Sequence, residues 1–311
     1  HNKVAINMVW VLITGFLVMF MQAGFALVET GLTRAKNANH TMAMNFMVYA
    51  LGMIGFFISG FAIMFGGFGS IGTLGGFGGL SHEFAINIFG HSFGLFGTTG
   101  FLLSGGSYDV AVFALFLFEM VFMDTTATIP TGSMAERWKF SSFAIYGILV
   151  GAIIYPIFGN WVWGGGWLSQ LGHMFGLGHG VVDFAGSAVV HMTGGVLALV
   201  GAKMIGPRVG KYNKDGSINA IPGHNIPLAI VGCFILAFGW FGFNSGSSLA
   251  GGDLRISVVA VNTMIASATG AFASMVYMWW FKTKKPDPTM MMNGMLAGLV
   301  AITAPCAFVN V

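Results

Sequence analysis

The stretch Asp183-Phe-Ala-Gly-Ser-Ala-Val-Val-His191 places a carboxylate at the start of an apolar run and an imidazole inside it. From Phe184 to Ala202 the run holds no Asp, Glu, Lys, Arg or second His. A run of this length and composition predicts a membrane-spanning helix. At a rise of about 1.5 Å per residue, His191 lies about two turns deeper than Asp183. Because an ionisable ring at that depth costs free energy, it indicates a functional site.

The composition of the whole chain indicates the same solvent. Charged residues make up 7% and hydrophobic residues 56%, whereas soluble proteins have roughly 25% charged residues. The 48 glycines are typical of helices that pack closely within a bilayer. The net charge of +3 without a basic run excludes nucleic acid as an expected partner. Cys233 and Cys306 lie in apolar stretches and are interpreted as small buried hydrophobes, not as disulfide or metal residues.

Apolar runs divide the chain into eight expected spans within a single transmembrane domain, 1–311. These runs are continuously apolar, without the alternation of barrel strands, so they predict an all-α polytopic membrane protein. No soluble domain of any size is expected, although a short interfacial helix is expected near Phe84–Phe93. The expected spans lie near residues 4–28, 41–65, 109–130, 140–162, 181–204, 226–247, 255–281 and 289–311.

The basic residues predict the orientation of these spans. Lys and Arg are concentrated in cytoplasmic loops of membrane proteins. Eleven of the 13 basic residues fall in connections on one side, and only Lys3 and Arg255 fall on the other. The N-terminus is therefore expected outside. The eleven are Arg34, Lys36, Arg137, Lys139, Lys203, Arg208, Lys211, Lys214, Lys282, Lys284 and Lys285.

Several polar and aromatic residues stand out from this background, each with a structural and a functional interpretation. Asp183 is either a helix cap or part of a site, and His191 is either bonded to a neighbouring helix or part of a conduction path. Phe118 and Phe122 lie one turn apart, which is typical of packing but also of a hydrophobic constriction. Trp163 precedes three glycines; it is an interfacial anchor or, with Phe118 and Ser247, part of an outer site for a small cation.

Three acidic residues lie inside expected spans. Glu29 lies near the end of its span, within expected reach of Arg34 or Lys36. Glu119 and Asp124 are five residues apart and do not share a helix face. A structural hydrogen-bonding role is the interpretation for each of the three. No nucleophile–base, metal-ligand or nucleotide-binding motif occurs, so neither an enzyme nor a metal or cofactor site is expected.

A series of motifs in a fixed order resembles the ammonium transporter (Amt/Rh/Mep) family along nearly the whole chain. The motifs include Gln22-Ala-Gly-Phe-Ala26, Thr33-Arg-Ala-Lys-Asn37, Ala135-Glu-Arg137, Trp163-Gly-Gly-Gly166, Asp183-Phe-Ala-Gly186 with Val189-Val-His191, Trp240-Phe-Gly-Phe-Asn244 with Gly246-Ser247, and Gly298-Leu-Val300 with Thr303 and Cys306.

The resemblance implies roles position by position. Phe118, Trp163 and Ser247 correspond to the outer recruitment site for ammonium, and Phe118 with Phe122 to the stacked phenyl gate beneath it. Asp183 corresponds to an acidic residue that orders this site. His191 corresponds to the first of two pore histidines. Ammonium is thereby recruited outside, and ammonia and its proton cross a hydrophobic pore separately.

The resemblance also implies an architecture and partners. The family's eleven spans form two inverted five-helix repeats, so the second repeat is incomplete here and the second pore histidine has no counterpart. We therefore expect the polypeptide to continue beyond Val311. The implied assembly is a homotrimer in the lipid bilayer of the plasma or inner cell membrane, with ammonium or ammonia as substrate. Glu119, where the family commonly has Gln, and Asp124 are departures that bear on rate and selectivity.

Two alternative functions stay open. One is an ammonium receptor of the same fold, coupled to a C-terminal cytoplasmic signalling domain or a regulatory protein, with little or no flux. The other is conduction of a small neutral molecule such as carbon dioxide. The cation-site residues Trp163 and Ser247 favour ammonium over the neutral molecule.

Overall fold

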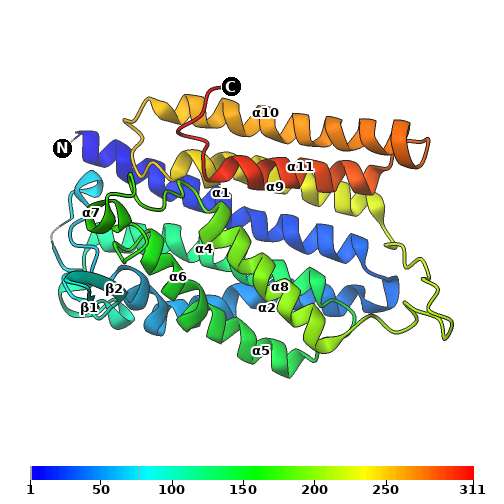
Figure 1. Cartoon of the computed structure of the whole chain (residues 1–311), viewed down its shortest axis with the longest axis horizontal. Helices are drawn as coiled ribbons and strands as arrows, with labels where there is room; N and C mark the ends of the chain where they lie inside the picture. The colour runs from blue at the N-terminus through cyan, green and yellow to red at the C-terminus, as the bar shows by residue number, and fades with distance from the viewer. Residues whose placement is uncertain (1, 77) are drawn as a thin grey trace.

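Long apolar helices lie side by side along the longest axis of the molecule (Figure 1). The structure is a computed structural model that describes residues 2–76 and 78–311. In this part of the chain, seven helical stretches are long and apolar enough to cross a membrane. They are Asn2–Leu32, Ala35–Phe65, Val110–Ser133, Phe140–Val162, Ser187–Ile205, Ile226–Gly246 and Arg255–Lys282. The all-α membrane architecture expected from composition is confirmed.

Several spans are built from more than one element, because single π-type turns interrupt the α-helical bonding. The helices are α1 (Asn2–Leu32), α2 (Ala38–Gly55), η2 (Phe56–Gly60), α3 (Phe61–Phe65), α4 (Val110–Ser133), α5 (Phe140–Leu149), η6 (Val150–Ile154), α6 (Tyr155–Val162), α7 (Leu171–Phe175), η7 (Ser187–Met192), α8 (Thr193–Ile205), α9 (Ile226–Gly246), α10 (Arg255–Val276), η8 (Tyr277–Lys282) and α11 (Pro288–Thr303). Short 3₁₀ turns are η1 (Ala35–Asn37), η3 (Gly72–Leu74), η4 (Phe101–Leu103) and η5 (Gly105–Ser107).

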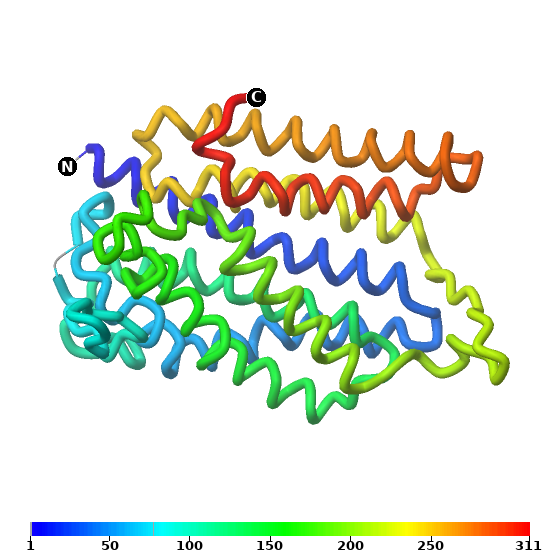
Figure 2. The backbone as a smooth tube through the Cα atoms, viewed as in Figure 1, coloured from blue at the N-terminus to red at the C-terminus, as the bar shows by residue number. Residues whose placement is uncertain are grey.

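The helix α4 lies at the centre of the bundle. It packs against α1, α2 and α8, and most of its residues are buried. The α10–α11 pair lies along one long edge of the molecule, with α5 along the opposite edge (Figure 2). The core of the protein therefore follows α4 and the α1–α9 pair that packs beside it.

The eighth expected span, 289–311, is shorter in the structure. The helix α11 ends at Thr303 and is followed by turns. Pro305 has no N–H to continue the helical ladder, and the Asn262 side chain binds the carbonyls of Cys306 and Val309 at 2.9 and 3.0 Å. With 16 residues, α11 rises about 24 Å, less than the thickness of a bilayer core.

The short helix expected near Phe84–Phe93 is wrong, because this segment forms a β-hairpin. Strands β1 (Glu83–Ile88) and β2 (His91–Gly97) pair antiparallel. The two turn residues Phe89 and Gly90 both have positive φ, 52° and 79°, as a type I′ hairpin turn requires. The alternation of apolar residues in Phe84-Ala-Ile-Asn-Ile88 is the local pattern that favours a strand.

The basic connections lie at one end of the molecule and the hairpin at the other (Figure 1). At the basic end, Glu136 forms ion pairs with Arg34 and with Arg208, the latter at 3.4 Å. Burial opposes ionisation of this carboxyl, but hydrogen bonds from Arg34 and the charges of both arginines lower the pKa of Glu136. The ion pairs thereby join three separate connections at that end.

Candidate functional site

A cavity of about 150 Å³ lies at the hairpin end of the bundle, where α4, α6 and α9 converge. It contains all three residues that the sequence predicts for an outer cation site, Phe118, Trp163 and Ser247. Trp163 is the C-cap of α6 and Ser247 the C-cap of α9, whereas Phe118 lies in the middle of α4. The cavity is lined by Phe65, Phe68, Leu115, Phe118, Glu119, Phe122, Trp163, Phe184, Ser247 and Leu249.

Trp163 is held in the wall of this cavity by its own hydrogen bond and by the glycines that follow it. Its Nε1 donates to the Asp183 carbonyl at 2.6 Å. A Cβ at Gly164 would lie 1.9 Å from the Met64 carbonyl oxygen, so only glycine allows the chain to turn there. Gly165 has φ of 91°, which also favours glycine.

A column of aromatic rings closes the floor of the cavity. Phe118 and Phe122 lie 4.7 Å apart between ring centroids but are tilted at 38°. The stacked partner of Phe122 is Phe243 on α9, at 3.9 Å and 24°. The resemblance implied a stack of Phe118 on Phe122, whereas Phe122 stacks on Phe243, to which no role was assigned from the sequence. Phe243 precedes Ser247 by four residues on α9, and this spacing puts both on one helix face, a signal that could have found it.

His191 lies beneath this column. Its ring stacks on Trp240 at 5.1 Å and 15° and lies 5.5 Å from Phe243. Trp240 is in turn fixed by a 2.8 Å hydrogen bond from its Nε1 to Thr303 Oγ1. The aromatic surroundings leave His191 only 8% exposed.

The hydrogen bonding of His191 defines which ring nitrogen is free. Its Nδ1 lies 3.0 Å from the Gly186 carbonyl oxygen. Since a carbonyl only accepts, Nδ1 carries the hydrogen. In the neutral ring Nε2 is then an acceptor, and this buried atom has no partner among the described residues. The backbone N–H of His191 donates to the same carbonyl at 3.0 Å. The imidazole therefore offers one unoccupied acceptor within the membrane-spanning region.

Asp183 caps the start of the helix that carries His191. Its Oδ1 accepts from the amides of Gly186 and Ser187 at 2.7 and 3.1 Å. Its Oδ2 accepts from Ala188 and Val189 at 2.8 and 2.9 Å. The span consequently begins at Ser187, not near 181, and Gly186 at φ 114° makes the turn into it. Asp183 is not among the residues that line the cavity, and its four amide contacts organise the start of this span.

The motifs and this geometry agree with a comparison against known families. A sequence profile described as the Ammonium Transporter Family matches residues 9–311. The chain belongs to the ammonium transporter family. It is a multi-pass protein of the cell membrane.

Relatives within this family share the chain's whole length but are longer. The chain is 49% identical over 312 residues to ammonium transporter Amt2 of Archaeoglobus fulgidus, covering 100% of this chain and 62% of that protein. It is 39% identical over 310 residues to ammonium transporter Amt1 of Haloferax mediterranei, covering 96% of this chain and 56% of that protein. The chain thus spans about three fifths of the length of these curated relatives.

Solved structures of the family have the same fold. A structure described as a sensor Amt protein superposes with a TM-score of 0.85 at 36% identity, covering 99% of this chain and 70% of that one. Mep2 of Candida albicans superposes with a TM-score of 0.77 at 27% identity, covering 96% of this chain and 60% of that one. The Amt/Mep helix bundle is therefore the fold of this chain.

The acidic residues of this ammonium transporter-family chain differ from the expected arrangement. Glu29 does not reach Arg34 or Lys36; instead its Oε2 accepts from Asn45 and Thr131 at 2.7 and 2.5 Å. The hydrogen-bonding role expected for it is confirmed with different partners. The segment between Glu29 and the two basic residues turns away from the helix axis after Leu32, so the basic side chains lie beyond the helix end.

Glu119 and Asp124 lack the partners that a structural role requires. Oε2 of Glu119 and Oδ1 of Asp124 are buried without a hydrogen bond among the described residues. Glu119 lines the outer cavity, whereas Asp124 does not. Within the described part of the chain no group of three or more His, Cys, Asp or Glu could hold a metal ion.

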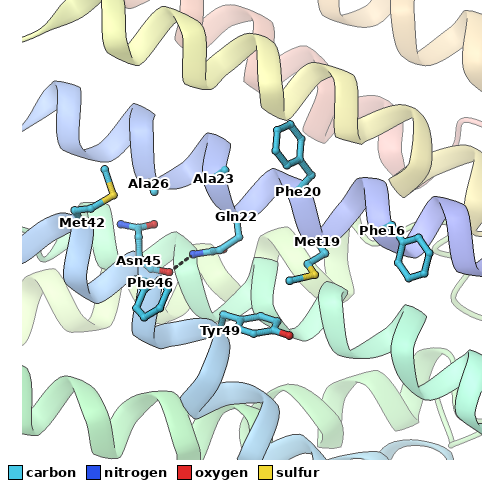
Figure 3. A pocket seen from close by; sticks show the side chains of 10 residues that line it. All are labelled: Phe16, Met19, Phe20, Gln22, Ala23, Ala26, Met42, Asn45, Phe46 and Tyr49. Atoms are coloured by element: carbon cyan, nitrogen blue, oxygen red, sulfur yellow. Dashed lines mark hydrogen bonds between the residues drawn. The ribbon is translucent and has the colours of Figure 1, made fainter.

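A larger cavity of about 500 Å³ lies between α1 and α2, away from these residues (Figure 3). Its wall is mostly apolar, with exposed side chains such as Phe46 (74% exposed). Gln22 and Asn45, joined by a 2.6 Å hydrogen bond, are its polar members. None of the residues that line this hollow belongs to the aromatic column.

Proposed function

We propose that this protein transports ammonium across the cell membrane. The observation that supports this most is the convergence of Phe118, Trp163 and Ser247 on one small cavity, with His191 beneath the stacked rings that close it. Aromatic faces attract a small cation, and a hydroxyl can accept a hydrogen bond from its N–H groups. The cavity then recruits ammonium at the outer end.

Passage beyond the aromatic column requires a change of charge. Transfer of ammonium into an apolar pore carries a large desolvation cost, which neutral ammonia largely avoids. In this proposal ammonium loses a proton near the column, and the free Nε2 of His191 serves as a hydrogen-bond acceptor and proton relay. Potassium cannot lose a proton, so the same pore excludes it.

An ammonium-evoked current provides the test. Purified protein is reconstituted and pulsed with ammonium on a solid-supported membrane. The wild type gives a current that potassium does not evoke, and His191→Ala abolishes it, because the membrane interior then lacks the relay. His179→Ala, which removes an exposed imidazole in the outer connection, leaves it unchanged. Absence of a wild-type current, or an unchanged current in His191→Ala, contradicts the proposal.

A second candidate is an ammonium receptor, because one of the similar structures is described as a sensor Amt protein. A receptor uses the same outer cavity but binds ammonium without passing it. Calorimetric binding of ammonium together with absence of current distinguishes this candidate from a transporter. In either case we propose a trimeric assembly, to be tested by the mass of the purified protein.

A further inference from the structure

We propose that Glu119 is a direct ligand of the cation in the outer cavity, so that a carboxylate sets the cation affinity and selectivity of this protein together with the aromatic rings. This proposal rests on the proposed function, since it names an additional binding residue for the same cavity. It assigns a purpose to a side chain that neither the fold nor the aromatic column uses.

The position of Glu119 is unusual for an acidic residue. It lies on α4 next to Phe118, it is only 7% exposed, and it lines the 150 Å³ cavity. Its Oε2 has no hydrogen-bond partner in the described part of the chain. None of the ion pairs formed by the described residues includes it. The carboxyl group therefore borders an aromatic cavity, and at least one of its oxygens accepts no hydrogen bond from the described residues.

The energetics of burial favour a cation as the missing partner. A buried carboxylate without a partner is costly, and such groups in proteins are paired or bind a cation. Among the described residues that line the cavity, the side chains with an N–H or O–H donor are Trp163 and Ser247, and both already donate to backbone carbonyls, those of Asp183 and Phe243. A small cation that enters the cavity supplies the opposite charge. Binding of the cation therefore removes the free-energy cost of the buried, unpaired carboxylate.

The shape and chemistry of the cavity define the class of ligand. A water molecule occupies roughly 30 Å³ of liquid, so a cavity of about 150 Å³ holds a small monovalent cation but not a large organic one. Ammonium and methylammonium offer N–H donors to the Glu119 carboxylate, and charge-assisted hydrogen bonds of this kind are strong. Potassium offers only charge. Glu119 therefore favours N–H cations over alkali ions.

Asp124 provides a matched control on the same helix. It is also a buried carboxyl with an unpartnered oxygen, but it does not line the cavity. Five residues separate the two, about 140° around the helix. Glu119→Gln and Asp124→Asn each remove one buried acid with little change of shape. Only the first removes the charge of the proposed ligand.

The experiment is isothermal titration of ammonium chloride and methylammonium chloride into the purified protein in lipid nanodiscs. We expect Glu119→Gln to weaken ammonium binding roughly tenfold or more, because the amide oxygen that replaces the carboxylate still accepts a hydrogen bond but carries no charge, with Asp124→Asn close to wild type. Glu119→Gln within twofold of wild type, or equal losses in both variants, overturns the proposal.

Further variants separate this proposal from the function on which it rests. If Trp163→Leu abolishes ammonium binding while Glu119→Gln binds within twofold of wild type, the cavity is a cation site but Glu119 is not one of its ligands. If the wild type binds no ammonium, the result contradicts both the proposed function and the role of Glu119. If Glu119→Gln does not fold, Glu119→Asp replaces it in the experiment. The aspartate side chain is one methylene shorter, so its carboxylate lies farther back from the cavity, and the binding preference should shift from ammonium toward the larger methylammonium. An unchanged ratio of the two affinities overturns the role of Glu119.

Discussion

At the scale of single residues, Asp183 and His191 have separate tasks although they lie in one short stretch. Both carboxylate oxygens of Asp183 accept backbone amides, which leaves it little capacity for a ligand. His191 keeps one ring nitrogen free. The cap also places Gly186, whose carbonyl accepts from His191 Nδ1. Asp183 thereby helps to determine which imidazole nitrogen of His191 stays without a partner among the described residues.

Loss of this cap should destabilise the outer end. Asp183→Ala leaves four backbone amides without their acceptor, and each buried unsatisfied donor costs about 1–3 kcal/mol. Asp183→Asn keeps one acceptor oxygen, so a smaller loss is expected. Thermal unfolding of the purified variants, followed by tryptophan fluorescence, measures both. Equal melting temperatures for Asp183→Ala and wild type would falsify the capping role.

Glu83 links the hairpin to the end of α6. Asn160 Nδ2 donates to its Oε2 at 3.2 Å, but Glu83 Oε1 and Asn160 Oδ1 are buried without partners. Burial raises the pKa of Glu83 from its ordinary 4.5 to about 7, against the opposing effect of the Asn160 hydrogen bond. A proton on Glu83 would let the carboxyl donate to an acceptor in this cluster.

The raised pKa of Glu83 predicts a pH dependence of stability. Well below pH 4.5 the group is protonated in both the folded and unfolded states, and its contribution to stability is fully present. As the pH rises toward about 7, only the folded state holds the proton, so this contribution is progressively lost. Between pH 5 and 8, wild-type melting temperature should therefore fall more steeply than that of Glu83→Gln. Parallel curves for the two proteins would contradict the assignment.

At the scale of elements, glycines set the distance between α2 and the fourth span. A Cβ at Gly151 would lie 2.2 Å from the Gly52 carbonyl oxygen, and one at Gly60 would lie 2.0 Å from the Gly151 carbonyl oxygen. These contacts involve backbone atoms, which cannot move aside as a side-chain end can. Small residues of this kind allow membrane helices to approach closely. The two spans are thus locked at a short separation.

Substitution of Gly151 by Ala should separate these helices. Overpacking of this kind costs about 1–3 kcal/mol, which should lower the melting temperature. Gly195→Ala is the control, because a Cβ there meets nothing within 4 Å and alanine favours helix by about 1 kcal/mol over glycine. Thermal unfolding in one detergent compares the two. A destabilised Gly195→Ala with an unchanged Gly151→Ala would refute the packing argument.

At the scale of the whole molecule, charge and shape define two unlike ends. The four connections that carry eleven of the basic residues lie at one end, opposite the hairpin (Figure 1). Cytoplasmic loops are enriched in Lys and Arg. We therefore expect the basic end inside the cell and both the N-terminus and the cavity outside.

Cysteine labelling tests this orientation with little background, because both native cysteines, Cys233 and Cys306, are buried. Phe89→Cys lies at the exposed hairpin turn and Lys214→Cys in the exposed loop at the opposite end. A membrane-impermeant maleimide should label the first in intact cells and the second only after permeabilisation. The reverse pattern, or labelling of both in intact cells, would contradict an outside N-terminus.

The residues that could be predicted from the sequence are those whose signals are local. Trp163 and Ser247 stand in recognisable motifs and Phe118 is marked by its one-turn spacing from Phe122, and the structure places all three on one cavity. The hairpin was missed although its alternation was visible, because an apolar loop beside a membrane was expected to be helical. The ring that stacks on Phe122 was missed because it belongs to α9, more than a hundred residues along the chain.

The sequence by itself determined the membrane class, the approximate limits of seven of the eight expected spans, and the family. Hydropathy, basic loops and ordered motifs are properties of contiguous segments, and they are readable without a fold. The tertiary structure decided which side chains meet: Phe243 with Phe122, Trp240 with His191, and Glu119 with the outer cavity. Such meetings depend on how helices rotate and pack against one another, and that is set by close packing across the whole bundle.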